Sequence, residues 1–218
     1  MKEFYRRSLP HLQPMGGTFF VTFRLAGSLP LSLIQEFRAQ YADKKKALAQ
    51  IKVPDQRELI YQERKRHFVR YDDALDQALY GNCYLREPAQ SQLVADELRR
   101  HDSSLYELIA YCIMPNHVHT LFDTNIQLAE EPEFYNLEYL EYKPLEKIMR
   151  QIKGASSRAV NLSLERTGQL WQHESYDHWV RNHREFDNIL WYILNNPVKA
   201  GLVKFWRDWP FSYCKYEP

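Results

Sequence analysis

The alternation of apolar and polar positions predicts the strands of an antiparallel sheet. In "GGTFFVTFRLAGSLP", Phe19, Val21 and Phe23 occupy every second position, which places their side chains on one face of a strand. The segments "YELIAYCIM" and "HVHTLFD" flank a turn at Pro115 and Asn116, a pattern typical of an antiparallel hairpin. We therefore expect at least these three strands to belong to one sheet.

Apolar residues at helical spacing predict most of the remaining elements. Residues 31–70 are rich in charge and are interrupted by Pro54, so we expect a pair of helices inserted after the first strand. Further helices are predicted for "EPAQSQLVADELRRH", "KPLEKIMRQIKGASSRAVN" and "NHREFDNILWYILNN", with a short strand inside "QLWQHESYDHWVRN". Because strands and helices alternate with hairpins, the predicted fold class is α+β, an antiparallel sheet with packed helices. The length predicts a single domain over residues 1–218.

Composition and charge exclude several classes of protein. The chain has 7 glycines and no glycine-rich phosphate-binding loop, and its 3 cysteines fit neither a disulfide framework nor a zinc motif. No apolar run reaches the length of a signal peptide or a membrane span, so we expect a cytoplasmic protein without a membrane partner. The net charge of +1 means that any nucleic-acid binding must depend on the local distribution of charge.

Two histidines in the predicted hairpin are the first candidate for chemistry. His117 and His119 lie two positions apart in "HVHTLFD", and residues at i and i+2 of a strand point to the same side. Neutral imidazole is a common metal ligand, so the pair can chelate a divalent ion. The spacing alone leaves a second interpretation open, in which the two are ordinary polar residues on one face of a sheet.

A tyrosine in the last long helix is the second candidate. Asn182 is a predicted N-cap, and Tyr192 lies about 130° from the centre of the apolar stripe at 100° per residue. Asn196 follows one turn later on the same flank, so both side chains can approach one target. Pro197 is expected to limit the helix at this point. In the alternative interpretation, Tyr192 is a rim residue of an amphipathic helix and Asn196 forms a cap or turn.

A basic face is predicted on the helix "KPLEKIMRQIKGASSRAVN". Lys143, Lys147, Arg150 and Arg158 fall together opposite the apolar side, and Gly154 in their midst permits close approach of another backbone. No acidic residue is expected to pair with this face, which favours a surface that binds phosphates. A solvated helix face is the alternative.

Taken together, the motifs resemble those of the REP-associated tyrosine transposases, which belong to the single-tyrosine, HUH-type transposases of bacterial insertion sequences. The resemblance rests on "MPNHVHTL", "IKGASSRAVN", "WQHESYDHWVRN", "YILNNPVKAGLV" and "DWPFS" in this order, with "RRSLPHLQP" near the start. It covers nearly the whole chain and is weakest over residues 31–70. It implies a ferredoxin-like or RRM-like fold with the histidine pair on a central strand.

The resemblance also implies residue roles. His117 and His119 match the pair that binds a divalent ion, Mg²⁺ or Mn²⁺, and Asn196 matches a third polar residue that faces the metal. Tyr192 matches the nucleophile. An auxiliary family motif is matched by Asp177 and His178, to which no role is assigned.

The implied activity is metal-dependent cleavage and strand transfer of single-stranded DNA at hairpin-associated sites, through a covalent 5′-phosphotyrosine. The implied partner is therefore single-stranded or hairpin DNA, bound by a monomer or a homodimer. The residues expected to bind backbone phosphates are Arg6, Arg7, Lys143, Lys147, Arg150 and Arg158. Two other functions remain open: a non-catalytic RRM-like nucleic-acid-binding protein, and a metal-dependent phosphohydrolase in which water replaces tyrosine.

Overall fold

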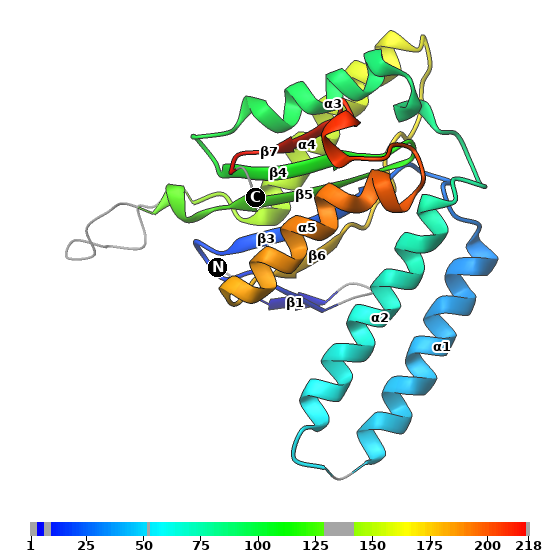
Figure 1. Ribbon diagram of the computed structural model, residues 1–218, viewed down its shortest axis with the longest axis vertical. Coiled ribbons are helices and arrows are strands. Elements are labelled where there is room, and N and C mark those ends of the chain that lie inside the picture. Colours follow the sequence, from blue (N-terminus) through cyan, green and yellow to red (C-terminus); the bar gives the residue numbers. More distant parts are fainter. Residues whose placement is uncertain (1–3, 7–9, 52, 129–141, 217–218) are drawn as a thin grey trace.

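The structure is built around a central β-sheet. The computed structural model describes residues 4–6, 10–51, 53–128 and 142–216. Helices cover both faces of the sheet, and a long helical hairpin projects from one side of it (Figure 1). No helix in these described ranges is long and apolar enough to span a bilayer.

The sheet confirms the predicted fold class. Its strands are β3 (Thr18–Arg24), β4 (Glu107–Ile113), β5 (His117–Asp123), β6 (Tyr176–Trp179) and β7 (Ser212–Cys214). They lie in the order β6-β3-β5-β4-β7, and all neighbours are antiparallel. The strands β1 (Phe4–Arg6) and β2 (Pro10–Leu12) pair separately. The path β3-α3-β4-β5-α4-β6 has the ferredoxin-like β-α-β-β-α-β connectivity, and β5 lies at the centre of the sheet.

The part of the chain that the structure describes contains five α-helices: α1 (Leu31–Gln50), α2 (Gln56–Asp76), α3 (Pro88–Arg100), α4 (Leu145–Ser163) and α5 (His183–Lys199). Single turns of 3-10 helix occur at Tyr84–Arg86, Asn125–Gln127 and Trp206–Asp208. The inserted hairpin α1–α2 ends six residues beyond the predicted limit of residue 70. The additional turn of α2 contributes directly to the site described below.

The predicted end of the last helix was wrong. The helix α5 continues through Pro197 to Lys199. Proline interrupts a helix because it has no N–H to donate to the carbonyl four residues earlier. Pro197 has a small effect on α5 because only two helical residues follow it. The Ala200 N–H then bonds to the Asn196 carbonyl and closes the turn. The other end agrees with the sequence, since the Asn182 side chain accepts a hydrogen bond from the Glu185 N–H at 2.9 Å.

Alternation along the strands creates two apolar layers. Phe19, Val21 and Phe23 pack with α3 and α4 on one face of the sheet, whereas Phe20 and Leu121 pack with α5 on the other. The side chains of β5 at odd positions share the α5 face with Leu121. Both histidines of β5 therefore point away from α3 and α4 and toward α5.

The three cysteines are free, as expected. Cys112 is fully buried within the apolar layer under α5, and Cys83 and Cys214 are half-buried. A small apolar side chain in a packed layer explains Cys112 without any disulfide or metal role.

Candidate active site

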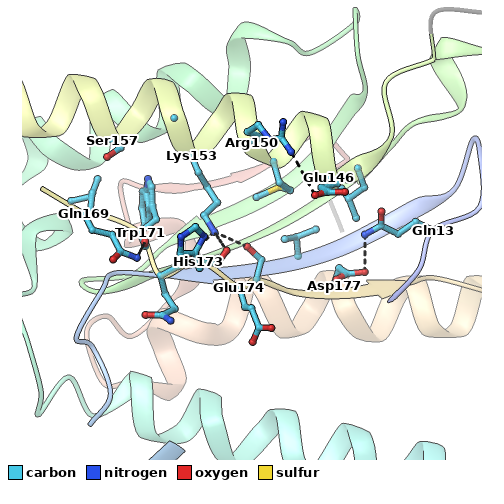
Figure 2. Close-up of a pocket in the computed structure, with 17 residues that line it drawn as sticks. Gln13, Glu146, Arg150, Lys153, Ser157, Gln169, Trp171, His173, Glu174 and Asp177 are labelled. Carbon is cyan, nitrogen blue, oxygen red and sulfur yellow. Dashed lines mark hydrogen bonds and ion pairs between the residues drawn. The ribbon is translucent and has the colours of Figure 1, made fainter. Parts of the chain in front are cut away.

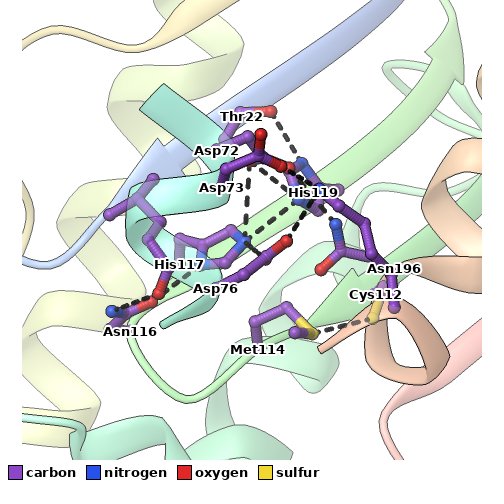
Figure 3. A network of polar contacts seen from close by, with 12 residues as sticks. Thr22, Asp72, Asp73, Asp76, Cys112, Met114, Asn116, His117, His119 and Asn196 are labelled. Atoms are coloured by element: carbon purple, nitrogen blue, oxygen red, sulfur yellow. Dashed lines mark hydrogen bonds and ion pairs between the residues drawn. The ribbon is translucent and has the colours of Figure 1, made fainter. Parts of the chain in front are cut away.

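The two histidines of β5 lie side by side beneath α2 and α5 (Figure 3). Both are completely buried, and their Nε2 atoms are 3.0 Å apart. The pKa of each imidazole is lowered to about 3, mainly by burial. For His117, the neighbouring His119 contributes to the same lowering. Both imidazoles are therefore neutral at pH 7, which is the form that binds metal ions.

Hydrogen bonds fix the His117 ring so that a lone pair points inward. Its Nδ1 lies 2.7 Å from the Asn116 Oδ1, and the Asn116 amide is oriented by donating its Nδ2 to the Leu75 carbonyl at 3.0 Å. Because an amide oxygen only accepts, the His117 Nδ1 must donate. The Nε2 of neutral His117 is therefore unprotonated and faces His119.

Thr22 orients the second imidazole ring, that of His119. It lies directly opposite His119 in the β3–β5 register, and its Oγ1 is 2.7 Å from the His119 Nδ1. A hydroxyl can donate or accept. When Thr22 accepts, the His119 Nε2 is also unprotonated, and two lone pairs converge on one point. An outer hydrogen bond of this kind is what orients histidines that bind metals.

A carboxylate completes a three-residue group, and it comes from the inserted hairpin. The Asp72 Oδ1 on α2 lies 3.3 Å from the His119 Nε2 and 3.8 Å from the His117 Nε2, so these three side chains could share one ion. Two ligands about 2.1 Å from one ion at right angles are about 3 Å apart. The three observed separations match that spacing closely enough to hold a divalent ion.

Unsatisfied oxygens support a metal at this point. Among the described residues, no donor hydrogen-bonds to the Asp72 Oδ1 or to the Asn196 Oδ1, although both atoms are buried. Burial raises the pKa of Asp72, since an isolated carboxylate is costly to remove from water. A divalent cation held by His117, His119 and Asp72 would satisfy the Asp72 Oδ1, so these three residues fit such an ion.

A second carboxylate and a lysine border the group. The Asp76 Oδ1 lies 3.7 Å from the His117 Nε2, one helical turn after Asp72. Lys199 of α5 bridges to the Asp76 Oδ2 at 2.9 Å and to the Asp73 Oδ1 at 2.5 Å. Burial, and then the charge of Asp72, raises the pKa of Asp76 to about 6. These ion pairs tie the end of α2 to the end of α5.

Tyr192 reaches this group directly. Its hydroxyl donates to the Asp72 Oδ2, and its ring centroid is 5.6 Å from that of His119. Asn196 donates its Nδ2 to the same Asp72 oxygen at 3.3 Å. Burial, and then the charge of Asp72, raises the pKa of Tyr192, so its hydroxyl is protonated at neutral pH. The fold thus brings together the histidine pair, Tyr192 and Asn196, with Asp72 in contact with all of them.

The helix α2 covers the site. Phe68 of α2 packs edge-on against Phe20 of β3 with centroids 5.5 Å apart and stacks on Tyr176 of β6 at 4.1 Å. Asp72 follows Phe68 one turn later on the same face of the helix. This apolar anchor explains why Asp72 is held over the histidines and why the histidines have no exposed surface.

The auxiliary pair from β6 lies away from the histidines. His178 sits 3.1 Å from the Glu185 Oε1, an oxygen that also accepts from Tyr61 and pairs with Lys65 of α2. The Asp177 Oδ2 accepts from the Gln13 Nε2 at 3.2 Å. His178 therefore belongs to a second group of contacts between α2 and the body of the protein, at the start of α5.

The basic face of α4 lies across the sheet from Tyr192, because α4 packs on the opposite apolar layer (Figure 1). The prediction that it lacks an acidic partner was wrong: Glu146 lies 3.7 Å from Arg150, one turn before it. Lys143 precedes the first helical residue, Leu145, so it does not lie on the helix itself. Lys147 and Arg158 are exposed.

A hollow of about 470 Å³ lies beside α4, between the helix and residues 169–175 (Figure 2). Lys153 spans it and donates to the carbonyls of Gln172 and His173 at 2.7 and 2.9 Å. The lysine is thereby used to hold the segment before β6. Of the predicted N-terminal cations, Arg6 lies in β1 opposite Pro10, and Arg7 lies outside the described residues.

Sequence reasoning missed Asp72. The only available signal was "RYDDALD", in which Asp72 and Asp76 are four residues apart on one helical face. Carboxylates at that spacing are common on solvated helices, so the pattern alone does not show that this face meets the sheet.

The fold and the site together define an α+β protein with a candidate metal group beside a tyrosine. Comparison with known proteins confirms the resemblance that the motifs indicate. The chain is 31% identical over 109 residues to a protein of Haemophilus influenzae named as a REP-associated tyrosine transposase; the match covers 49% of this chain and 58% of the relative. It is 29% identical over 107 residues to the REP-associated tyrosine transposase of Escherichia coli K12, covering 49% and 53% respectively.

The chain therefore spans just over half the length of the curated relatives it matches. No family model matches it. A solved structure of a REP-associated tyrosine transposase bound to a REP hairpin aligns with 97% of this chain and 82% of its own, at 21% identity and a TM-score of 0.45.

Proposed function

We propose that this protein cleaves and rejoins single-stranded DNA at hairpin-associated sites in a metal-dependent reaction, with Tyr192 as the nucleophile. One observation carries the proposal: the carboxylate that receives the Tyr192 hydroxyl also faces the paired Nε2 atoms of His117 and His119. The nucleophile and the candidate metal group are thereby joined by one side chain. The similarity to REP-associated tyrosine transposases supports the same conclusion.

The residues that would hold a divalent ion, Mg²⁺ or Mn²⁺, are His117, His119 and Asp72. We assign Asn196 as a further ligand through its Oδ1, which has no hydrogen-bond partner among the described residues. When bound, such an ion polarises the scissile phosphate and stabilises the charge that develops on it. The protein contributes neutral histidines, fixed ring orientations and a buried site in which electrostatic interactions are stronger than in water.

The chemical step is a transesterification. The Tyr192 oxygen forms a bond to phosphorus while the bond from phosphorus to the 3′-oxygen breaks, which leaves a 5′-phosphotyrosine and a free 3′-hydroxyl. The Asp72 Oδ2 already accepts the tyrosine hydroxyl, so it is positioned to receive that proton, and the 3′-oxygen gains one as it leaves. The reverse reaction with another 3′-hydroxyl rejoins strands without an external energy source.

A scissile phosphate must enter from the side of α2. Because His117, His119 and Asp72 are all buried in the described structure, the contact between the end of α2 and α5 has to open to admit DNA and to close again before Tyr192 and Asp72 act together. In this proposed function, residues 1–218 form one HUH-type domain in which the inserted hairpin controls access. Away from this site, phosphates of a DNA hairpin would be bound by Arg6, Arg7, Lys143, Lys147, Arg150 and Arg158. Asp177 and His178 would act as auxiliary residues that hold α2 in place.

A denaturing gel tests this function. Purified protein is incubated with Mn²⁺ or Mg²⁺ and an end-labelled single-stranded DNA that contains a hairpin. We expect a covalent protein–DNA band that requires metal and disappears in Tyr192→Phe, because phenylalanine keeps the ring but removes the attacking oxygen.

The matched control is Tyr61→Phe, which removes a half-buried hydroxyl of α2 that bonds to Glu185 and lies outside the candidate metal group. It should still form the adduct. Cleavage without an adduct that persists in Tyr192→Phe would instead indicate a phosphohydrolase, and binding without cleavage under either metal would indicate a non-catalytic nucleic-acid-binding protein.

A further inference from the structure

A second hollow lies against the tyrosine helix on the flank away from α2. It has a volume of about 490 Å³. Its walls are formed by α5 and by the segment that returns beside it, and they include Trp191, Asn195, Val198, Phe205, Trp206 and Arg207. We call it the α5 groove. No residue of the metal group lines it.

The chain reversal after α5 creates the groove. Gly201 adopts a positive φ of 70°, a conformation that other residues rarely adopt. The Gly201 N–H bonds to the Val198 carbonyl and the Leu202 N–H to the Pro197 carbonyl. The chain thus turns back at once, and residues 204–208 lie next to the last two turns of the helix.

Large aromatic side chains in the groove are left exposed. Phe205 is 69% exposed and Trp191 is 45% exposed. An exposed cluster of large apolar rings indicates a binding surface. Each ring offers a flat face on which a planar ligand can stack.

The charge around the rings is mainly positive. Lys204 and Arg207 are both exposed at the rim, and the Arg207 guanidinium lies 4.9 Å from the centre of the Trp206 ring. Asp208 is the single acidic residue among the groove-lining side chains described. Rings bordered by cations are suited to a ligand that has both planar bases and phosphates.

The groove is also close to the nucleophile. On α5, Trp191 and Tyr192 are adjacent in sequence and therefore about 100° apart around the helix axis. Asn195 and Lys199 occupy the surface between the two flanks. A strand that crosses α5 with its bases in the groove would extend toward the tyrosine hydroxyl.

We propose that the α5 groove binds unpaired nucleotides of a DNA strand, with bases stacked on Trp191 and Phe205 and phosphates held by Lys204 and Arg207. The inference builds on the proposed function, because it assigns the single-stranded part of that substrate to a surface. A second copy of this chain is the competing occupant; the cationic rim favours a polyanion over an identical, equally cationic surface.

The test measures binding without cleavage. In the Tyr192→Phe background with chelator present, fluorescence anisotropy follows a labelled oligothymidylate and, separately, a duplex of equal length. We expect Trp191→Ala and Phe205→Ala each to weaken binding of the oligothymidylate roughly tenfold, because one stacking interaction is lost. Binding of the duplex should not change. Lys204→Ala or Arg207→Ala should reduce the salt dependence of binding, by about 0.7 in the logarithmic slope.

The controls are exposed residues far from the groove: Leu162→Ala on α4, which is 79% exposed, and Arg57→Ala at the first turn of α2. Both should bind like the parent. Oligothymidylate affinity that is unchanged in Trp191→Ala and Phe205→Ala overturns the inference. So does a loss of self-association in sedimentation with DNA affinity unchanged.

The two proposals fail in different ways. If no covalent adduct forms with intact Tyr192 but the groove variants still lose affinity, the groove stands and the tyrosine chemistry is wrong. If the adduct forms and the groove variants bind like the parent, the tyrosine chemistry stands and the groove assignment is wrong.

Discussion

Asp72 connects the parts of the candidate site. One of its oxygens accepts from Tyr192 and Asn196, and the other faces the two histidines without a hydrogen-bond donor among the described residues. A buried carboxylate oxygen without a partner destabilises the folded protein. Binding of a divalent cation would remove that penalty, so in the proposed function the metal affinity and the position of the nucleophile depend on the same residue.

This dependence predicts the behaviour of Asp72→Asn. The amide has nearly the same shape but lacks the negative charge, so Mn²⁺ affinity measured by titration calorimetry should fall roughly tenfold or more. Asp73→Asn is the matched control, because Asp73 is the adjacent residue, is exposed, and pairs only with Lys199 in the contacts described. Equal losses of affinity in the two variants would show that Asp72 acts through net charge and not as a ligand.

At the residue level, the sequence predicted four members of the site and missed the fifth. His117 and His119 share a strand, and Tyr192 and Asn196 share a helical flank, so local periodicity was sufficient to pair them. Asp72 shares no element with any of them. It reaches the histidines only because Phe68, one turn earlier, is anchored against Phe20 and Tyr176.

At the level of elements, the hairpin α1–α2 buries a titratable side chain, His67. This side chain is buried between Tyr41 of α1, with rings stacked 4.5 Å apart, and Tyr71 of α2. Burial, and then the positive charge of Arg70, lowers the pKa of His67 to about 4 from its ordinary value near 6.5. The folded hairpin therefore favours the neutral imidazole.

The sign of the resulting pH dependence follows from that shift. Above pH 6.5 the histidine is neutral in both states, and its contribution to stability is complete. As the pH falls from about 6.5 to about 4, the unfolded state gains a proton that the folded state does not, so the free energy of unfolding decreases. Urea denaturation should show this decrease, and it should be smaller in His67→Leu. Identical pH profiles for the two proteins would contradict the assignment.

The extent of α2 shows why element boundaries were harder to predict than elements. Pro54 separated α1 from α2 as expected, but the charge-rich sequence from which we predicted the insertion ended at residue 70. The helix continues to Asp76, where Asp72 and Asp76 contact the histidines of β5 and Asp76 pairs with Lys199. Tertiary contacts extended a helix that local propensity alone leaves undecided.

At the scale of the whole molecule, metal binding should stabilise the folded chain. The proposed ligands come from α2 and β5, which are separated by more than forty residues in sequence and meet only in the folded protein. An ion that binds only the folded state, at a free concentration a hundred times its dissociation constant, contributes about 2.7 kcal/mol. For a chain of this length that corresponds to a rise in Tm of roughly 5 to 10 °C.

Differential scanning fluorimetry with Mn²⁺ checks this expectation, and excess chelator should reverse the rise. The double variant His117→Ala/His119→Ala should show no rise, because it lacks two of the three ligands. A rise of equal size in the double variant would place the bound ion elsewhere. No rise in the parent protein would remove the basis for a metal site.

The sequence by itself determined the α+β class, the antiparallel hairpin with its histidine pair, and the flank of the helix that carries Tyr192. Each of these is set by a periodicity of two or of about 3.6 residues, which a linear pattern records. The tertiary structure decided which carboxylate completes the candidate metal group, which face of the sheet contains this group, and that α2 covers it. Those features depend on contacts between segments far apart in the chain, and no local pattern encodes them.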